Sequence, residues 1–208
     1  MVAYETRLQT DPRWALSEGS RHFEDRSAVH DTLRRVTARL NDLGIPYAVS
    51  GGMALFHHGL RRFTEDVDIL VTTEGLRGIH DSLVGLGYLP VVAGGKGIRD
   101  TQTGVRIDFI ISGEYPGDGK PKPVRFPDPS GVALEHDHIR YLNLPTLIEL
   151  KLASGMTNPA RLRDLSDVLE LIRLLALPPA FAEQHLSPFV REKFLELHRA
   201  GASEPAGP

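Results

Sequence analysis

Hydrophobic residues near the start of the chain recur at helical spacing. Five of them are separated by four, three, four and three positions: Val29, Leu33, Val36, Leu40 and Leu43. This spacing predicts one amphipathic helix, because it aligns a single apolar stripe. Asp25 or Ser27 can cap its beginning, and Gly44 ends it.

Two apolar runs that follow are typical of buried strands. IPYAVSGG is rich in β-forming residues and closes on Gly51 and Gly52, which predicts a strand that stops at a tight turn before a short helix, MALFHHGL. In DVDILV, Asp66 and Asp68 alternate with apolar residues. The two carboxylates of this predicted strand therefore leave the face opposite to the apolar side chains.

Helices and strands continue to alternate beyond residue 72. Residues 74–86 predict a helix whose apolar side consists of Leu76, Ile79, Leu83 and Leu86. YLPVV and VRIDFII predict two strands, and GIRDTQTG before the second predicts a hairpin turn at Gly104. Residues 112–130 are rich in Gly and Pro and predict a long loop, either a mobile lid or a substrate-facing arm.

The last third of the chain has helical character. Thr146 and Glu149 have capping-box spacing for a helix over LIELKLASG, and Asn158 with Pro159 suits the start of the next one. The buried stripe predicted for that second helix is Leu162, Leu165, Leu169, Ile172 and Ala176. A last helix covers roughly residues 188–199.

These elements predict an α+β fold, a mixed β-sheet flanked by helices with a helical C-terminal portion. We expect a catalytic core over residues 25–142, a helical portion over 143–200 that completes the site, and flanking segments 1–24 and 201–208. The 208 residues are enough to bury a core.

Composition excludes several kinds of chemistry. The chain has no cysteine, which rules out disulfides, thiolate-bound metals and a cysteine nucleophile. Its 24 Lys+Arg against 27 Asp+Glu give a net charge of -3, so only a local basic patch can attract a polynucleotide. No signal-peptide core or membrane-length apolar run is present, and we expect a soluble, cytoplasmic protein.

The acidic positions are the best candidates for chemistry. Two carboxylates two residues apart on a strand repel unless a cation lies between them, and hard oxygen ligands select Mg²⁺ or Mn²⁺. A lone D-x-D pair is more often simply solvated. Ser50, Gly51 and Gly52 change that weighting, because a hydroxyl and exposed amides after a strand suit a triphosphate. If the strand of Asp108 neighbours that of Asp66 and Asp68, three carboxylates converge and can hold two ions.

This pattern resembles the signature G-G-x-A…G…R-x-T-x-D-x-D of the nucleotidyltransferase superfamily with the polymerase-beta-like core. The positions that carry the resemblance are Gly51, Gly52, Arg61 or Arg62, Thr64, Asp66, Asp68 and, as the third acidic residue, Asp108. Further on, Leu147-Ile-Glu-Leu-Lys151 and Arg161-Leu-Arg-Asp164-Leu-Ser-Asp167 are similar to the helices of AbiEii/MenT-type nucleotidyltransferase toxins.

The resemblance implies transfer of a nucleoside monophosphate from an NTP such as ATP to an acceptor hydroxyl, with release of pyrophosphate. It assigns Mg²⁺ or Mn²⁺ to Asp66, Asp68 and Asp108, with Asp108 alternatively a general base. It assigns phosphates to Ser50, Gly51, Gly52, Arg62, Thr64 and Lys151. Asp164 would orient Lys151 or the nucleotide base. The acceptor would be tRNA, a protein or a small molecule, and a toxin would have a cognate antitoxin.

Simpler interpretations stand beside these assignments. Lys151 can also be an ordinary lysine that extends its ammonium from an apolar surface to solvent. Asp164 can form a surface ion pair with Arg161, and Asp167 can form a second such pair with Arg163. Thr64 can make a turn or cap bond.

Other polar groups also have two interpretations. His57 and His58 are adjacent and point apart on a helix, so they do not bind one metal together. The alternating spacing of His136-Asp137-His138 could bind a metal on a strand, but exposure of these side chains to solvent is the favoured interpretation. Cations that could steer RNA, without an aromatic pattern to stack bases, are Lys96, Arg99, Lys120, Lys122 and Arg125. The alternative to an enzyme is a catalytically silent nucleotide- or partner-binding module on the same fold.

Overall fold

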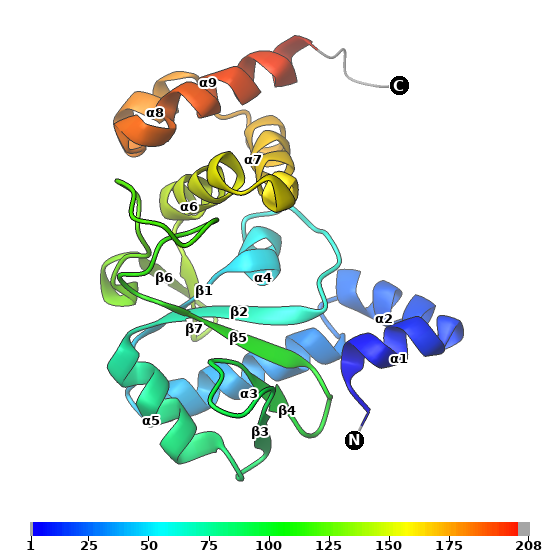
Figure 1. Cartoon of the computed structure of the whole chain (residues 1–208). Helices are drawn as coiled ribbons and strands as arrows, with labels where there is room; N and C mark the ends of the chain where they lie inside the picture. Colours follow the sequence, from blue (N-terminus) through cyan, green and yellow to red (C-terminus); the bar gives the residue numbers. More distant parts are fainter. Residues whose placement is uncertain (1, 204–208) are drawn as a thin grey trace. The chain divides into compact units, whose positions relative to one another are not determined.

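A computed structural model describes residues 2–203 and contains one mixed seven-stranded sheet (Figure 1). The strands lie in the order β3-β4-β5-β2-β1-β7-β6. Their bounds are β1 Tyr47–Val49, β2 Asp66–Val71, β3 Tyr88–Pro90, β4 Ile98–Asp100, β5 Arg106–Ile111, β6 Ala133–His136 and β7 Ile139–Leu142. β2 runs parallel to β5 and antiparallel to β1, and β1 runs parallel to β7. The predicted α+β class with a mixed sheet is confirmed.

The chain divides into two compact units. Unit 1 holds the whole sheet and comprises the described residues up to His57, Arg61–Ser112 and Asp128–Leu142. Unit 2 comprises His58–Leu60, Gly113–Pro127 and the described residues from Asn143 onward. No helix within residues 2–203 is long and apolar enough to cross a membrane.

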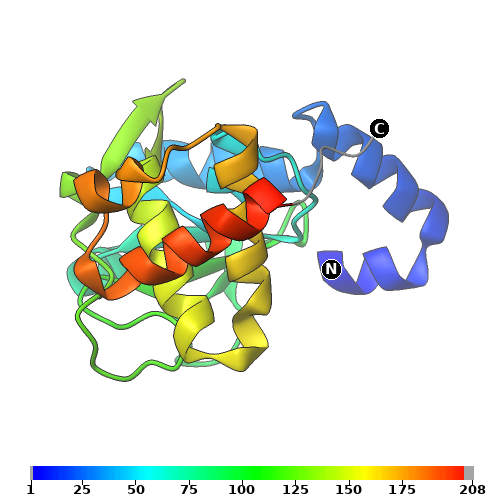
Figure 2. The ribbon, with the colours of Figure 1, turned by 90° about the horizontal axis from the view of Figure 1, so that it is seen from above.

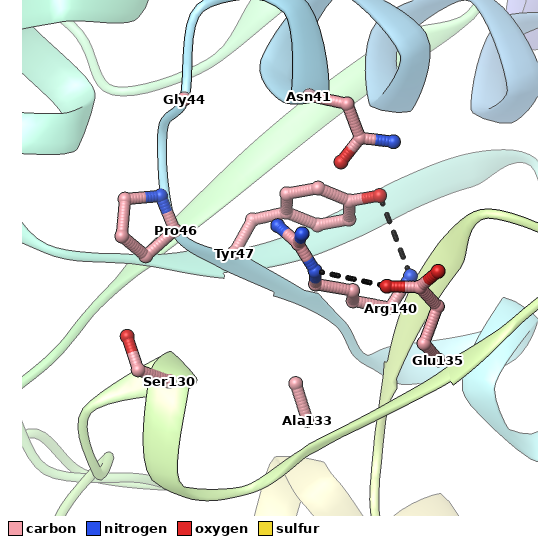
Figure 3. Close-up of a pocket in the computed structure, with 8 residues that line it drawn as sticks. All are labelled: Asn41, Gly44, Pro46, Tyr47, Ser130, Ala133, Glu135 and Arg140. Atoms are coloured by element: carbon pink, nitrogen blue, oxygen red, sulfur yellow. Dashed lines mark hydrogen bonds and ion pairs between the residues drawn. The ribbon is translucent and has the colours of Figure 1, made fainter.

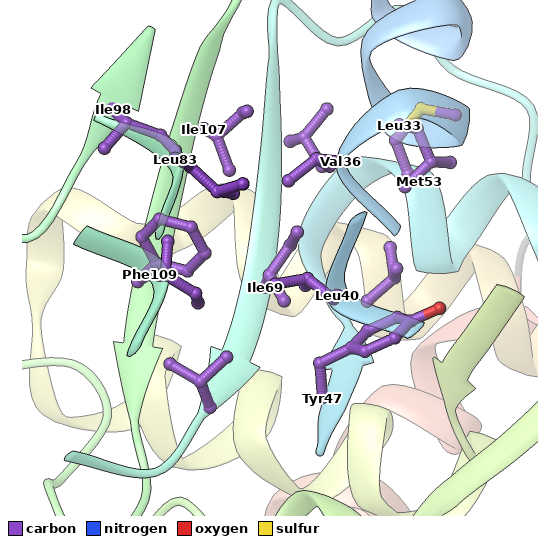
Figure 4. Close-up of a cluster of buried hydrophobic side chains, with 14 of the residues drawn as sticks. Leu33, Val36, Leu40, Tyr47, Met53, Ile69, Leu83, Ile98, Ile107 and Phe109 are labelled. Atoms are coloured by element: carbon purple, nitrogen blue, oxygen red, sulfur yellow. The ribbon is translucent and has the colours of Figure 1, made fainter. Parts of the chain in front are cut away.

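Helices cover both faces of the sheet in unit 1. The helices of this unit are α1 Tyr4–Thr10, α2 Pro12–Phe23, α3 Ala28–Asp42, α4 Gly51–His57 and α5 Thr73–Leu83, with a 3₁₀ turn, η1, at Pro129–Gly131, and α3, α4 and α5 are the ones that cover the sheet. α3 and α5 lie on one face and α4 on the other (Figure 1). Apolar side chains of α3, α5, β2 and β5 point into one core, which lies between the sheet and the helices α3 and α5 (Figure 4). The predicted stripe of α3 is buried as far as Leu40.

Unit 1 contains details that the sequence pattern did not predict. Leu43 and Leu86 are exposed, since α3 ends at Asp42 and α5 ends at Leu83. Residues 1–24, expected as a flanking segment, contain α1 and α2, which lie beside the start of α3 (Figure 2). α2 buries Glu18 and His22 where an apolar stripe would show, so hydrophobic periodicity does not reveal it.

Two hairpins flank the central strands. The predicted one joins β4 to β5, and Gly104 in its turn has φ 75°. The second, β6 to β7, was not predicted. Asp137 and His138 form its turn, and both have a left-handed backbone, with φ 49° and 62°. The sequence Asn-Gly usually indicates such a turn, and Asp-His does not. The solvent-exposed interpretation of the His136 to His138 segment is confirmed.

Unit 2 is helical. Its elements are α6 Leu144–Thr157, the 3₁₀ turn η2 Pro159–Arg161, α7 Leu162–Leu174, α8 Ala180–His185 and α9 Pro188–Ser203. The predicted capping box is wrong, because Asn143 caps α6 by accepting from Thr146 N at 2.9 Å, and Glu149 instead accepts from Ser187 N. Residues 204–208 of the predicted C-terminal segment lie outside the described residues.

The buried face of α7 is rotated from the predicted stripe. Leu162 is 66% exposed, and the buried residues are Asp167, Val168, Leu171 and Ile172. An acidic residue takes a core position here, which an apolar pattern cannot anticipate. The 113–127 loop has neither helix nor strand, and backbone bonds between Gly113 and Phe126 and between Phe126 and Glu114 close it.

Candidate active site

Three carboxylates converge on the face of the sheet opposite to the core of α3 and α5. Asp68 on β2 stands directly beside Asp108 on β5 in the parallel register, and Asp66 precedes them on β2. One oxygen from each of Asp66, Asp68 and Asp108 lies within 4.8 Å of the others. The adjacency of these strands, which the sequence left as a condition, is confirmed. Such a set of half-buried carboxylate oxygens suits a hard divalent cation.

Three glycines leave the space that this acidic cluster occupies. A Cβ at Gly51 would stand 1.8 Å from Asp68 Oδ2, and one at Gly97 would stand 2.9 Å from Asp108 Oδ1. A Cβ at Gly52 would stand 2.6 Å from Thr64 Oγ1. Any other residue at these positions would displace a side chain of the cluster or its support. The donor set and the space around it therefore fit a bound Mg²⁺ or Mn²⁺.

Gly97 was not predicted to belong to the site. It lies just before β4, and only the pairing of β4 with β5 brings it against Asp108. The run GGKGIRD was the available signal, since glycine before a strand often marks close approach of a backbone.

Ser50 and Thr64 support the acidic residues. Thr64 Oγ1 donates a hydrogen bond to Asp66 Oδ1 at 2.9 Å, which orients that carboxylate. Ser50 is 7% exposed, its N–H donates to Asp68 O at 2.8 Å, and its carbonyl accepts from Ala54 N at the start of α4. Thr64 thus makes a bond to a carboxylate rather than a turn or cap bond.

Asp108 is paired with an arginine on its own strand. Arg106 Nε lies 2.8 Å and Arg106 Nη2 2.7 Å from Asp108 Oδ1. Burial raises the pKa of Asp108, Asp66 adds to this, and Arg106 opposes it without cancelling it. Burial and the charge of Asp66 thus disfavour the ionised form of Asp108, which a bound cation would favour.

A chain of buried polar groups reaches the segment before β2. His22 Nε2 donates to the Arg62 carbonyl at 3.1 Å, and His22 Nδ1 lies 3.2 Å from Ser27 Oγ. Ser27 Oγ lies 2.9 Å from His30 Nδ1. Because a carbonyl only accepts, His22 carries its proton on Nε2, Ser27 donates to His22, and His30 donates to Ser27. The chain thereby anchors the backbone of Arg62 next to Thr64.

This chain predicts an acid-sensitive unit 1. Burial, followed by His22, lowers the pKa of His30 from 6.5 to about 4, so the unfolded chain binds more protons between these values. Stability should be complete above pH 6.5 and fall as pH drops from 6.5 toward 4. Urea denaturation at pH 7 and pH 5 measures this. His30→Asn keeps a donor near Ser27 without a titrating ring, and it should reduce the difference between the two pH values; an unchanged difference would contradict the assignment.

In unit 2 a buried lysine is held by two carboxylates. Lys151 is 7% exposed, and its Nζ donates to Asp164 Oδ1 at 2.8 Å and to Asp167 Oδ2 at 2.7 Å. Ser154 and Arg161 donate to the other oxygen of Asp164. Burial acts to raise the pKa of Asp164, but these partners, led by Lys151, outweigh it and hold the pKa below its usual range.

The structure corrects two alternatives for this cluster. Lys151 is not a snorkelling lysine, since its ammonium is buried in ion pairs. The surface pair of Asp167 with Arg163 is wrong, because Asp167 is 4% exposed and bonded to Lys151. Asp167 is therefore a site candidate that sequence reasoning missed, although its three-residue spacing from Asp164 places both on one helix face.

Several other polar residues have roles away from the acidic cluster. Arg99 donates to Glu5 and the Gly104 carbonyl, and Lys122 donates to Asp118 and Thr157, so both of these cations are engaged in ion pairs within the protein. His57 stacks on Tyr141 with ring centroids 4.1 Å apart.

A hollow of about 390 Å³ in unit 1 lies near the β6–β7 hairpin (Figure 3). Tyr47 Oη accepts from Arg140 N at 3.3 Å, and Arg140 pairs with Glu135. Asn41 Nδ2 donates to the His138 carbonyl at 2.8 Å. These bonds tie the hairpin to α3 and β1, and no predicted site residue lines the hollow.

The sequence matches no known protein family and no curated protein. Among solved structures, the chain is similar to ANT(2'')-Ia in complex with adenylyl-2''-tobramycin, at 12% identity and a TM-score of 0.48, over 83% of this chain and 96% of that one. A candidate nucleotidyltransferase from H. pylori is similar at 18% identity and a TM-score of 0.41, over 83% and 92% of the two chains. Similarity this distant carries no information about what the chain binds.

Proposed function

We propose that this protein is a metal-dependent nucleotidyltransferase that moves a nucleoside monophosphate from an NTP to an acceptor hydroxyl. The observation that carries the proposal is the convergence of Asp66, Asp68 and Asp108 on one sheet face, with glycines in place of any side chain that would crowd them. A catalytically silent binding module would not need three carboxylates in this arrangement. The residues match the sequence signature position by position.

In this proposal Asp66, Asp68 and Asp108 hold Mg²⁺ or Mn²⁺, which neutralises the triphosphate and favours ionisation of the acceptor hydroxyl. Thr64 fixes Asp66 through its hydrogen bond. Ser50, Gly51 and Gly52 present hydroxyl and backbone groups to phosphates, and Arg62 adds a cation. The acceptor oxygen forms a bond to the α-phosphorus while the bond to pyrophosphate breaks. The resemblance also allows Asp108 to act as the general base that takes the hydroxyl proton.

Lys151, a residue of unit 2, receives a role from the same resemblance. We assign its ammonium to the triphosphate, where a cation stabilises charge that develops on the leaving pyrophosphate. The bonds of Asp164 and Asp167 to Nζ support a role for both in orienting this ammonium.

For the acceptor we propose tRNA in the cytoplasm, with the protein as the toxin partner of a cognate antitoxin. This rests on the similarity of the Lys151 and Asp164 helices to AbiEii/MenT-type toxins. Protein and small-molecule acceptors, including aminoglycosides, are the outcomes that the same assay would reveal.

The test is incubation with each labelled NTP, Mg²⁺ or Mn²⁺, and total tRNA, cell lysate or an aminoglycoside. We expect label transfer to tRNA by the wild type and a loss of at least about 10³-fold in Asp66→Asn with Asp68→Asn, because both metal ligands lose their charge. Asp118→Asn with Asp128→Asn is a matched control on exposed loop carboxylates. Transfer that persists in the first double variant would refute the metal assignment, and no transfer to any acceptor would favour the binding module.

A further inference from the structure

Four charged side chains form a block on the face of β2 and β5 that is opposite to the core of α3 and α5. In the parallel register Asp66 stands beside Arg106, and Asp68 stands beside Asp108. The residues between them, Val67 and Ile107, are fully buried in the core on the other face. Three carboxylates and one guanidinium therefore share one small surface with a formal charge of about -2.

Arg106 concentrates its contact on a single oxygen. Its Nε and Nη2 both meet Asp108 Oδ1, at 2.8 and 2.7 Å. The same oxygen lies 2.9 Å from where a Cβ of Gly97 would stand. No side chain extends from Gly97, so the position of this carboxylate is set by Arg106 and by its own strand.

The ion pair between Arg106 and Asp108 can also separate. The side chain of Arg106 is 48% exposed and that of Asp108 26% exposed, so the guanidinium can turn into solvent and leave a half-buried carboxylate that a cation would neutralise. Solvent screens such a half-exposed pair, and a divalent cation outcompetes a guanidinium for a carboxylate oxygen when further ligands are at hand. Asp66 and Asp68 lie within reach to supply them.

We propose that Arg106 is a positioning residue. Until nucleotide binds, its guanidinium pairs with Asp108 and occupies the position that a second divalent cation would take. This rests on the proposed function. One divalent ion brings the charge of the block to zero, so a second ion must displace Arg106 from Asp108 or be attracted by the charge of a triphosphate. Without nucleotide, the protein then takes one tightly bound ion and resists the second.

The test is Mn²⁺ binding to the full chain without nucleotide, followed by electron paramagnetic resonance of the free ion. We expect one tight site in the wild type. In Arg106→Met the affinity for a second ion should rise at least about tenfold, because a unit charge roughly 4 Å from a divalent ion is removed. Circular dichroism checks folding, which an exposed arginine on β5 should not control.

Arg99→Met is the matched control. Arg99 is the antiparallel partner of Arg106 on β4, so the variant removes the same charge from the neighbouring position, but Arg99 bonds Glu5 rather than Asp108. Because the charge of Arg99 also acts on Asp108 but without a bond to it, the affinity for a second ion should rise less than in Arg106→Met. Equal stoichiometry and affinity in the wild type and Arg106→Met would overturn the inference, as would an equal gain in Arg99→Met. No Mn²⁺ binding by either folded protein would instead overturn the metal site of the proposed function.

Discussion

Replacing Gly51 with Ala is expected to reduce nucleotidyl transfer by at least about 10²-fold while unit 1 stays folded. The new Cβ would stand 1.8 Å from Asp68 Oδ2, so either the carboxylate or the start of α4 must move. A displaced metal ligand lowers both metal affinity and the rate of the chemical step. Steady-state kinetics with labelled NTP and Mn²⁺ binding measure the two effects separately.

Gly44→Ala separates this clash from backbone strain. Gly44 and Gly51 share a left-handed backbone, with φ 64° and 56°, but nothing stands within 4 Å of a Cβ at Gly44. Both variants should therefore lose a similar amount of stability, about 1–2 kcal/mol, from the left-handed conformation. Only Gly51→Ala should lose metal affinity. Equal activity in the two variants would show that Asp68 is not a ligand or that it tolerates displacement.

Replacing Lys151 with Met is expected to destabilise the helical unit by about 3–5 kcal/mol at pH 7, because it removes the buried ammonium that both Asp164 and Asp167 contact. Both carboxylates contact Nζ, and Asp167 is 4% exposed. Without Lys151 the pKa of Asp164 should rise, because burial acts to raise it and only Ser154 and Arg161 then oppose this. Urea denaturation followed by circular dichroism measures the loss.

The pH dependence and a compensating variant check the cause. In the wild type the lowered pKa of Asp164 means that its contribution to stability is present at neutral pH and is lost as pH falls through the folded pKa. Lys151→Met should instead approach the wild type as pH falls, because protonation of Asp164 removes its ion pair with Lys151 from the wild type as well. Adding Asp164→Asn and Asp167→Asn should restore most of the lost stability at pH 7. A destabilisation that is independent of pH and uncorrected in the triple variant would point to packing alone.

Much of the fold could be predicted from the local spacing of apolar and polar residues. The stripe of α3 and the alternation in β2 and β5 were predictable, because side-chain direction along a helix or strand follows from a period of 3.6 or 2 residues. That same alternation placed Asp66, Asp68 and Asp108 on faces away from the core. The elements that escaped prediction, such as α2 and the β6–β7 turn, bury polar residues or adopt a left-handed turn without the usual residues.

By itself, then, the sequence determined which acidic residues could act together and the chemistry that they suit. The tertiary structure decided that β2 pairs with β5 in the register that sets Asp68 beside Asp108, that Gly97 borders Asp108, and that Asp167 turns inward to Lys151. The physical reason is that periodicity reports only which way a side chain points from its own element. Which side chain it meets depends on strand order, register and helix rotation, and these are set by the packing of the whole unit.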